Sequence, residues 1–73
     1  MSDDTKDLVR MANQIGAFFG AYPEDEAKAG IAGHIKEFWT AAMRAKFDAH
    51  IAAGGEGVSP LVLAALAESK QAA

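Results

Sequence analysis

Cysteine is absent from this chain of 73 residues, and proline, tryptophan and tyrosine are scarce, at two, one and one residues. Without thiols, the chain can form neither a disulfide nor a thiolate zinc site. A domain of this size buries only about 60% of the surface that its unfolded chain exposes. Small domains often add disulfides, a metal or a partner to compensate. We therefore expect stability to come from packing or from association with a partner.

Long apolar runs are also missing, since the longest uninterrupted apolar stretch, at residues 61–67, has seven residues. A membrane-spanning helix needs roughly 20 such residues, so we expect no membrane partner. The first residues are acidic and polar, the reverse of the basic and then apolar start of a secretory signal. The net charge of −3 and the pI near 5.1 argue against nucleic acid as a partner, because phosphate-backbone binding relies on clustered Lys and Arg.

The chain does contain apolar residues at the three- and four-residue spacing that lines one face of a helix. This pattern predicts an all-α fold of three to four short helices, with no sheet, in a single domain over residues 1–73. The expected helices cover residues of about 5–20, 24–39, 41–53 and 60–70. We expect the segments 1–4 and 70–73 to fray, because the apolar pattern is lost there.

Capping residues define the expected helix boundaries. Pro23 suits the first turn of the second helix. Thr40 is the best N-cap candidate in the long stretch that follows, so we expect a bend there. The pair Gly54-Gly55 is typical of a C-cap, and Ser59-Pro60 is typical of a helix start.

Each helix is expected to present one apolar face, and that of the second helix is expected to be buried. The first face consists of Leu8, Met11, Ala12, Ile15, Phe18, Phe19 and Tyr22. The second consists of Ala27, Ile31, Ile35 and Phe38. The third consists of Met43, Phe47, His50 and Ile51, and the fourth of Val62, Leu63 and Leu66.

No group of residues has the spacing of a catalytic, cofactor-binding or metal site. His34 and His50 stand far apart, without a third ligand at helical spacing. Ser59 lacks the glycine-flanked elbow of a serine nucleophile and is better explained as a helix cap. The segment 54–57 lacks the strand and the Lys-Ser/Thr pair of a phosphate loop. We therefore expect no enzyme activity and no small-molecule substrate for the chain itself.

The segment around Phe38 and Trp39 concentrates residue types that protein interfaces favour. Trp, Met and Arg are enriched at interfaces, and Trp and Arg are the commonest hot spots. Adjacent helical residues point about 100° apart, so Phe38 and Trp39 cannot both lie at the centre of one narrow stripe. We expect Phe38 to pack inward and Trp39 to lie at the surface. The expected partner-binding residues are His34, Phe38, Trp39, Met43 and Arg44.

A second interpretation of the same segment remains open at this point. It places Trp39 in the core, as is common for a lone Trp in a small helical protein, and pairs Arg44 with Asp48 four residues further on. Composition does not decide between the two interpretations.

The order of motifs along nearly the whole chain resembles a known family. It begins with LVRMANQI at 8–15, Phe18-Phe19 and GIAGHI at 30–35, and continues with Phe38-Trp39, Met43-Arg44, His50, Gly54-Gly55 and SPLV at 59–62. In this order the sequence closely resembles the delta subunit of cytoplasmic NAD-dependent formate dehydrogenase. It departs from the family pattern at Thr40-Ala41, where Asp-Pro is usual. Thr still caps a helix and Ala still enters one, so the bend remains expected.

The resemblance implies a cytoplasmic accessory subunit that binds no cofactor itself. It would bind the large catalytic subunit and support assembly, the cofactor-loaded state or stability of the complex. The partner subunits would hold a molybdenum or tungsten pterin guanine dinucleotide, iron–sulfur clusters and FMN, and would pass electrons from formate to NAD, releasing carbon dioxide. The acidic charge and the apolar seam fit an alternative equally: a small self-associating helical regulator or adaptor with no enzyme partner.

Overall fold

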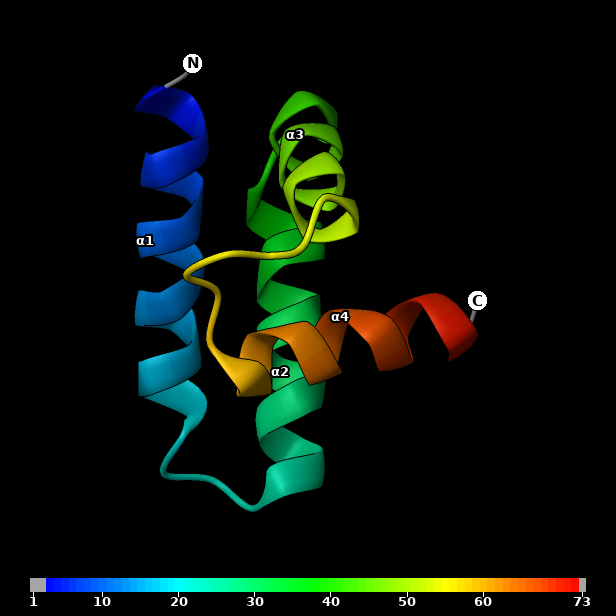
Figure 1. Cartoon of the computed structure of the whole chain (residues 1–73). Coiled ribbons are helices and arrows are strands. Elements are labelled where there is room, and N and C mark those ends of the chain that lie inside the picture. Colours follow the sequence, from blue (N-terminus) through cyan, green and yellow to red (C-terminus); the bar gives the residue numbers. More distant parts are fainter. Residues whose placement is uncertain (1–2, 73) are drawn as a thin grey trace.

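Four helices and no strand make up residues 3–72, the part of the chain that the computed structural model describes (Figure 1). The helices are α1 (Asp3–Phe19), α2 (Glu24–Phe38), α3 (Ala41–Ala52) and α4 (Pro60–Ala72). The predicted all-α class is confirmed, and the predicted boundaries lie close to the observed ones. Fraying at 1–4 and 70–73 stays a prediction, because residues 1, 2 and 73 lie outside the described residues and the others belong to α1 and α4.

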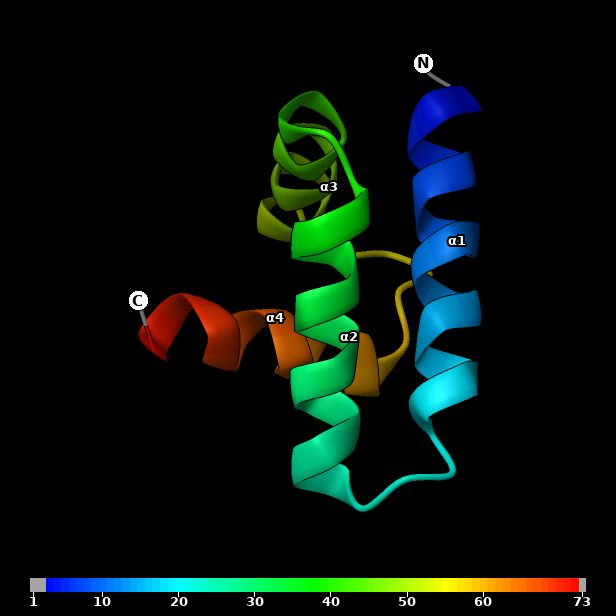
Figure 2. The same cartoon turned by 180° about the vertical axis from the view of Figure 1, so that it is seen from behind.

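The first two helices run antiparallel, side by side, and α4 crosses α2 at a steep angle (Figure 1). The third helix packs against α1 near the end of the molecule where α2 stops. Seen from behind, α2 lies in front of α4, and α1 stands next to α2 (Figure 2). Helices α3 and α4 therefore cover one side of the α1–α2 pair and leave the other side open.

Local capping interactions explain why the helices begin and end where they do. The Thr40 hydroxyl oxygen accepts a hydrogen bond from the Met43 backbone N–H at 3.1 Å, which is the N-cap of α3. The predicted bend at Thr40 is therefore confirmed. At the other end of α3, Gly55 N–H donates to the His50 carbonyl at 2.9 Å and Gly54 N–H to the Ile51 carbonyl at 3.0 Å. These two bonds form a Schellman motif, as the glycine pair predicted.

Asn13, a side chain of α1, anchors the loop between α3 and α4. Asn13 donates to the Gly57 carbonyl at 2.9 Å through Nδ2 and accepts from the Ser59 N–H at 3.0 Å through Oδ1. Gly57 has φ +83°, a left-handed conformation that favours glycine. Ser59 in turn caps α4, because its hydroxyl accepts from the Val62 N–H at 3.4 Å. Asn13 thus fixes the point where α4 begins.

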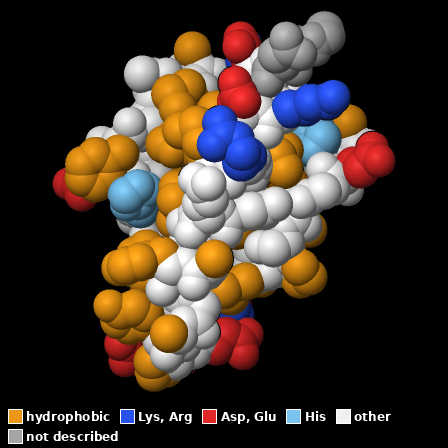
Figure 3. Space-filling model, turned by 90° about the vertical axis from the view of Figure 1, so that its left-hand side faces the viewer, with side chains coloured by type: hydrophobic (Ala, Val, Ile, Leu, Met, Phe, Trp, Pro, Cys, Tyr) orange, Lys and Arg blue, Asp and Glu red, His pale blue; other side chains and the backbone are white. Residues whose placement is uncertain are grey.

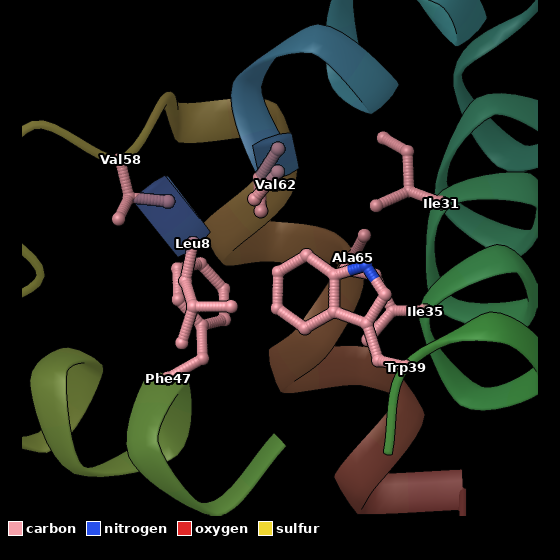
Figure 4. Packing of buried hydrophobic residues seen from close by; sticks show 9 residues of the cluster. Leu8, Ile31, Ile35, Trp39, Phe47, Val58, Val62 and Ala65 are labelled. Carbon is pink, nitrogen blue, oxygen red and sulfur yellow. The ribbon is translucent and has the colours of Figure 1, made fainter. Parts of the chain in front are cut away.

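The core lies between α2 and the other three helices (Figure 4). Its buried members are Leu8, Ala12, Ile31, Ile35, Trp39, Phe47, Val58, Val62 and Ala65. Each of the four helices contributes residues to this common core. Ion pairs also support the α2–α4 contact, because Lys28 pairs with Glu68 of α4 at 2.5 Å and with Glu24 at 3.0 Å.

The expected orientation of Phe38 and Trp39 is wrong, because Trp39 is buried in the core and Phe38 lies at the surface. Trp39 is only 5% exposed, whereas Phe38 is 69% exposed. Helix α2 ends at Phe38, and Trp39 already has extended backbone angles of φ −93° and ψ 143°. This change of direction lets the indole turn inward toward Leu8 and Phe47 (Figure 4). Phe38 is still helical and projects away from the core.

Candidate partner-binding surface

The structure divides the five predicted partner-binding residues among four environments. His34 and Phe38 lie together on α2, with their ring centroids 4.7 Å apart. Trp39 belongs to the core. Met43 is half-buried in a pocket between α1 and α3, whereas the next residue, Arg44, lines a different pocket between α2, α3 and α4. The single patch expected from the sequence is therefore not formed.

A different set of residues forms a continuous aromatic surface across α1 and α2. The three large hydrophobic side chains exposed in the described part of the chain are Phe18, Tyr22 and Phe38, at 66%, 46% and 69% exposure. We call this surface the α1–α2 aromatic face. Its residues are Met11, Ile15, Phe18, Phe19, Tyr22, His34 and Phe38.

Contacts among the rings hold the α1 part of this face in place. Phe18 packs edge to face against Phe19, with centroids 5.0 Å apart, and Tyr22 lies 5.6 Å from Phe19. Phe19 can lie close to α2 because residue 30 is glycine: a Cβ atom there would overlap the Phe19 ring. Gly30 thus sets the approach of α1 to α2, and the neighbouring rings of Phe18 and Tyr22 remain at the surface.

A pocket of about 320 Å³ lies within the α1–α2 aromatic face. It is lined by Met11, Gln14, Ile15, Phe18, Phe19 and His34, none of which is Asp, Glu, Lys or Arg. Figure 3 views the molecule from the α1 side and shows hydrophobic side chains gathered along its left edge, next to a histidine. Aromatic residues and Met are enriched at protein interfaces, and contiguous apolar patches commonly mark such sites. The surface can therefore hold an apolar segment of another protein.

Sequence reasoning placed Phe18 and Tyr22 on the same apolar face of α1 as Leu8 and Ala12 and so missed the separate surface that they form. The apolar positions of α1 span about 120° around an ideal helix, a width that a single core-facing stripe can have, so their spacing held no signal that part of them is exposed. Only the Leu8 and Ala12 part of that face is buried in the core.

Among the described residues, no group of three or more His, Asp or Glu side chains could hold a metal ion. The same residues contain no helix that is long and apolar enough to cross a membrane.

The model of the family described as NADH-dependent formate dehydrogenase delta subunit FdsD matches residues 7–66. The chain belongs to this family. The resemblance inferred from the motifs is therefore confirmed, and the match covers all of the α1–α2 aromatic face together with Arg44. No curated protein and no solved structure matches the chain. As a member of the delta-subunit family, the protein is an accessory subunit of formate dehydrogenase.

Proposed function

We propose that this delta-subunit family member has no active site and binds the large catalytic subunit of a cytoplasmic NAD-dependent formate dehydrogenase. In this role it supports assembly or stability of the cofactor-loaded complex. The partner subunits would carry the molybdenum or tungsten pterin, the iron–sulfur clusters and FMN. Two features support the proposal: the family match, and the absence of cysteine ligands from the sequence.

The α1–α2 aromatic face is the surface that we propose contacts the catalytic subunit. The observation that carries this assignment is the exposure of Phe18 and Phe38, at 66% and 69%, beside a pocket without Asp, Glu, Lys or Arg. Leaving such rings in water forgoes the free energy of burying their apolar area, about 25 cal/mol per Å². A partner that covers them recovers it, and Tyr22 and His34 can supply polar contacts at the edge of the interface.

Co-purification tests the proposal. A tagged chain is expressed with the other subunits of its complex, and recovery of the large subunit and of molybdenum or tungsten is measured. We expect Phe18→Ser combined with Phe38→Ser to reduce recovery of the large subunit at least about tenfold, as loss of two central aromatic contacts does. The matched control is Ala45→Ser with Ala49→Ser, two exposed changes on α3.

The possible outcomes separate the surface from the function. Unchanged recovery with a double variant that retains its circular dichroism spectrum and melting temperature would rule out the α1–α2 aromatic face. If the wild-type chain recovers no large subunit and runs as a stable homodimer in light scattering, the accessory role is wrong and the self-associating regulator is correct.

A further inference from the structure

Arg44 has a buried donor that the fold does not use. The residue lies on α3 and is half-buried as a whole. Its Nε atom is buried and has no hydrogen-bond partner among the residues that the structure describes. Buried polar atoms are nearly always hydrogen-bonded, and an unpaired donor on a charged group is especially unfavourable. Because Nε has almost no accessible surface, an acceptor from outside the described fold would satisfy it after a shift of the Arg44 side chain that opens Nε to the pocket that this residue lines.

The surroundings of Arg44 indicate what kind of acceptor fits. Arg44 lines a pocket of about 310 Å³ between α2, α3 and α4. The other lining residues are Ala32, Ile35, Lys36, Phe47, Asp48, Leu66 and Ser69. The walls are therefore largely apolar. Of the described residues, two cationic side chains, Lys36 and Arg44, and one carboxylate, Asp48, line the pocket, which leaves one positive charge in excess among them.

We propose that this pocket binds a carboxylate carried on an apolar stem: an Asp or Glu side chain, next to an apolar residue, of a partner protein. A guanidinium group binds carboxylates in a bidentate manner through parallel N–H donors, and Nε–H is one of these. A singly charged carboxylate matches the single excess positive charge better than a doubly charged phosphate. The apolar walls contact the stem and the neighbouring apolar residue.

The identity of the partner rests on the proposed function, in which the partner is the catalytic subunit. The pocket is distinct from the α1–α2 aromatic face, because it is formed by α2, α3 and α4 and shares no lining residue with that face. The interaction with the partner would thus have two parts, an aromatic contact and a charge-assisted contact. Each part can be removed by its own substitutions.

Nuclear magnetic resonance of the full chain tests the site directly, with hexanoate as the probe. We expect hexanoate to shift the Nε–Hε signal of Arg44 in a saturable manner, while the signal of the other arginine, Arg10, stays in place. Hexanamide has the same stem without the charge and should cause no such shift. Formate has the charge without the stem and should bind at least about tenfold more weakly, because each buried methylene contributes to affinity.

Three variants connect the signal to the side chain. Arg44→Gln should weaken hexanoate binding, followed at backbone signals of α3 and α4, by about tenfold or more. Arg44→Lys keeps the charge but not the Nε donor and should restore only part of the affinity. Arg10→Gln changes an exposed arginine on α1 and should leave the affinity unchanged. If the Arg44 variants do not fold, the comparison of hexanoate with hexanamide on the wild-type chain still tests whether the pocket binds a carboxylate.

The outcomes also separate this inference from the proposed function. Equal shifts with hexanoate and hexanamide, or equal affinities for hexanoate and formate, would overturn the inference. Unchanged recovery of the large subunit by a folded Arg44→Gln chain would also overturn it while leaving the accessory role intact. If the wild-type chain itself recovers no large subunit, the accessory role is refuted instead.

Discussion

The rings of Trp39 and Phe47 pack edge to face, with centroids 5.4 Å apart and an interplanar angle of 72°. This contact joins the end of α2 to the middle of α3 across the bend at Thr40. Both side chains are almost completely buried, at 5% and 1% exposure. The only tryptophan of the chain therefore holds two helices together at the position where the backbone changes direction.

Truncation of Trp39 should consequently damage the fold. We expect Trp39→Ala to lower the free energy of unfolding by about 3–5 kcal/mol, which is typical of a buried aromatic residue replaced by Ala. The neighbouring change Phe38→Ala removes an exposed ring and should alter that free energy by no more than about 0.5 kcal/mol. Urea unfolding followed by far-ultraviolet circular dichroism measures both. Equal effects of the two substitutions would contradict the assignment of Trp39 to the core.

Replacing two helical glycines by alanine should change the stability of the protein in opposite directions. At Gly33 an added Cβ meets no atom within 4 Å, so Gly33→Ala should stabilise the protein by about 0.5–1 kcal/mol through its helix propensity. At Gly16 the added Cβ would lie 2.8 Å from Cγ2 of Val62, which is fully buried. Overpacking of this kind costs about 1–3 kcal/mol, so Gly16→Ala should destabilise the protein. Melting temperatures of both variants test the pair, and stabilisation by Gly16→Ala would show that α1 and α4 can move apart.

Removal of the Asn13 side chain should loosen the start of α4. Asn13→Ala loses the bonds to Gly57 and Ser59 and leaves the partly buried Ser59 N–H without its acceptor. We expect a loss of about 1–3 kcal/mol in unfolding free energy. Hydrogen exchange should become faster at Ser59 and in the first turn of α4. Gln14→Ala, at the next position, is exposed and serves as the control. Equal exchange rates in both variants would rule out a stabilising role for Asn13.

Lys28 gives the α2–α4 contact a dependence on alkaline pH. The hydrogen bond to Glu68, followed by the one to Glu24, raises the pKa of Lys28 above its ordinary value of 10.5. Because the folded state holds this proton more tightly than the unfolded state, its stabilising effect is complete below pH 10.5. It is lost as the pH rises through the raised pKa of the folded state.

The stability difference between the wild type and Lys28→Met should therefore be constant from neutral pH to about pH 9 and shrink above pH 10.5. Urea unfolding across this range measures it. Lys6→Met, at an exposed lysine of α1, should show no comparable trend. A difference between wild type and Lys28→Met that stays constant up to pH 12 would contradict the assigned role of the two glutamates.

The absence of thiol chemistry follows directly from the composition. The helices and their ends could be predicted from the sequence because they depend on residues that are close together in the chain. Thr40 caps α3 through a residue three positions away, and the Gly54-Gly55 pair closes α3 through carbonyls of its last turn. Such interactions require no knowledge of the other helices. The order of motifs likewise predicted the family, which the match over residues 7–66 confirmed.

Only the tertiary structure decided which apolar residues are covered. Phe38 and Trp39 both flank the buried Ile35, and the pattern of hydrophobicity fits either one inside. The choice follows from the extended backbone at Trp39 and from the packing of α3 and α4 on one side of the α1–α2 pair. The same packing exposes Phe18 and surrounds Arg44 with apolar walls. These relations join residues far apart in the chain, so their free energy depends on how the helices meet, which no local pattern specifies.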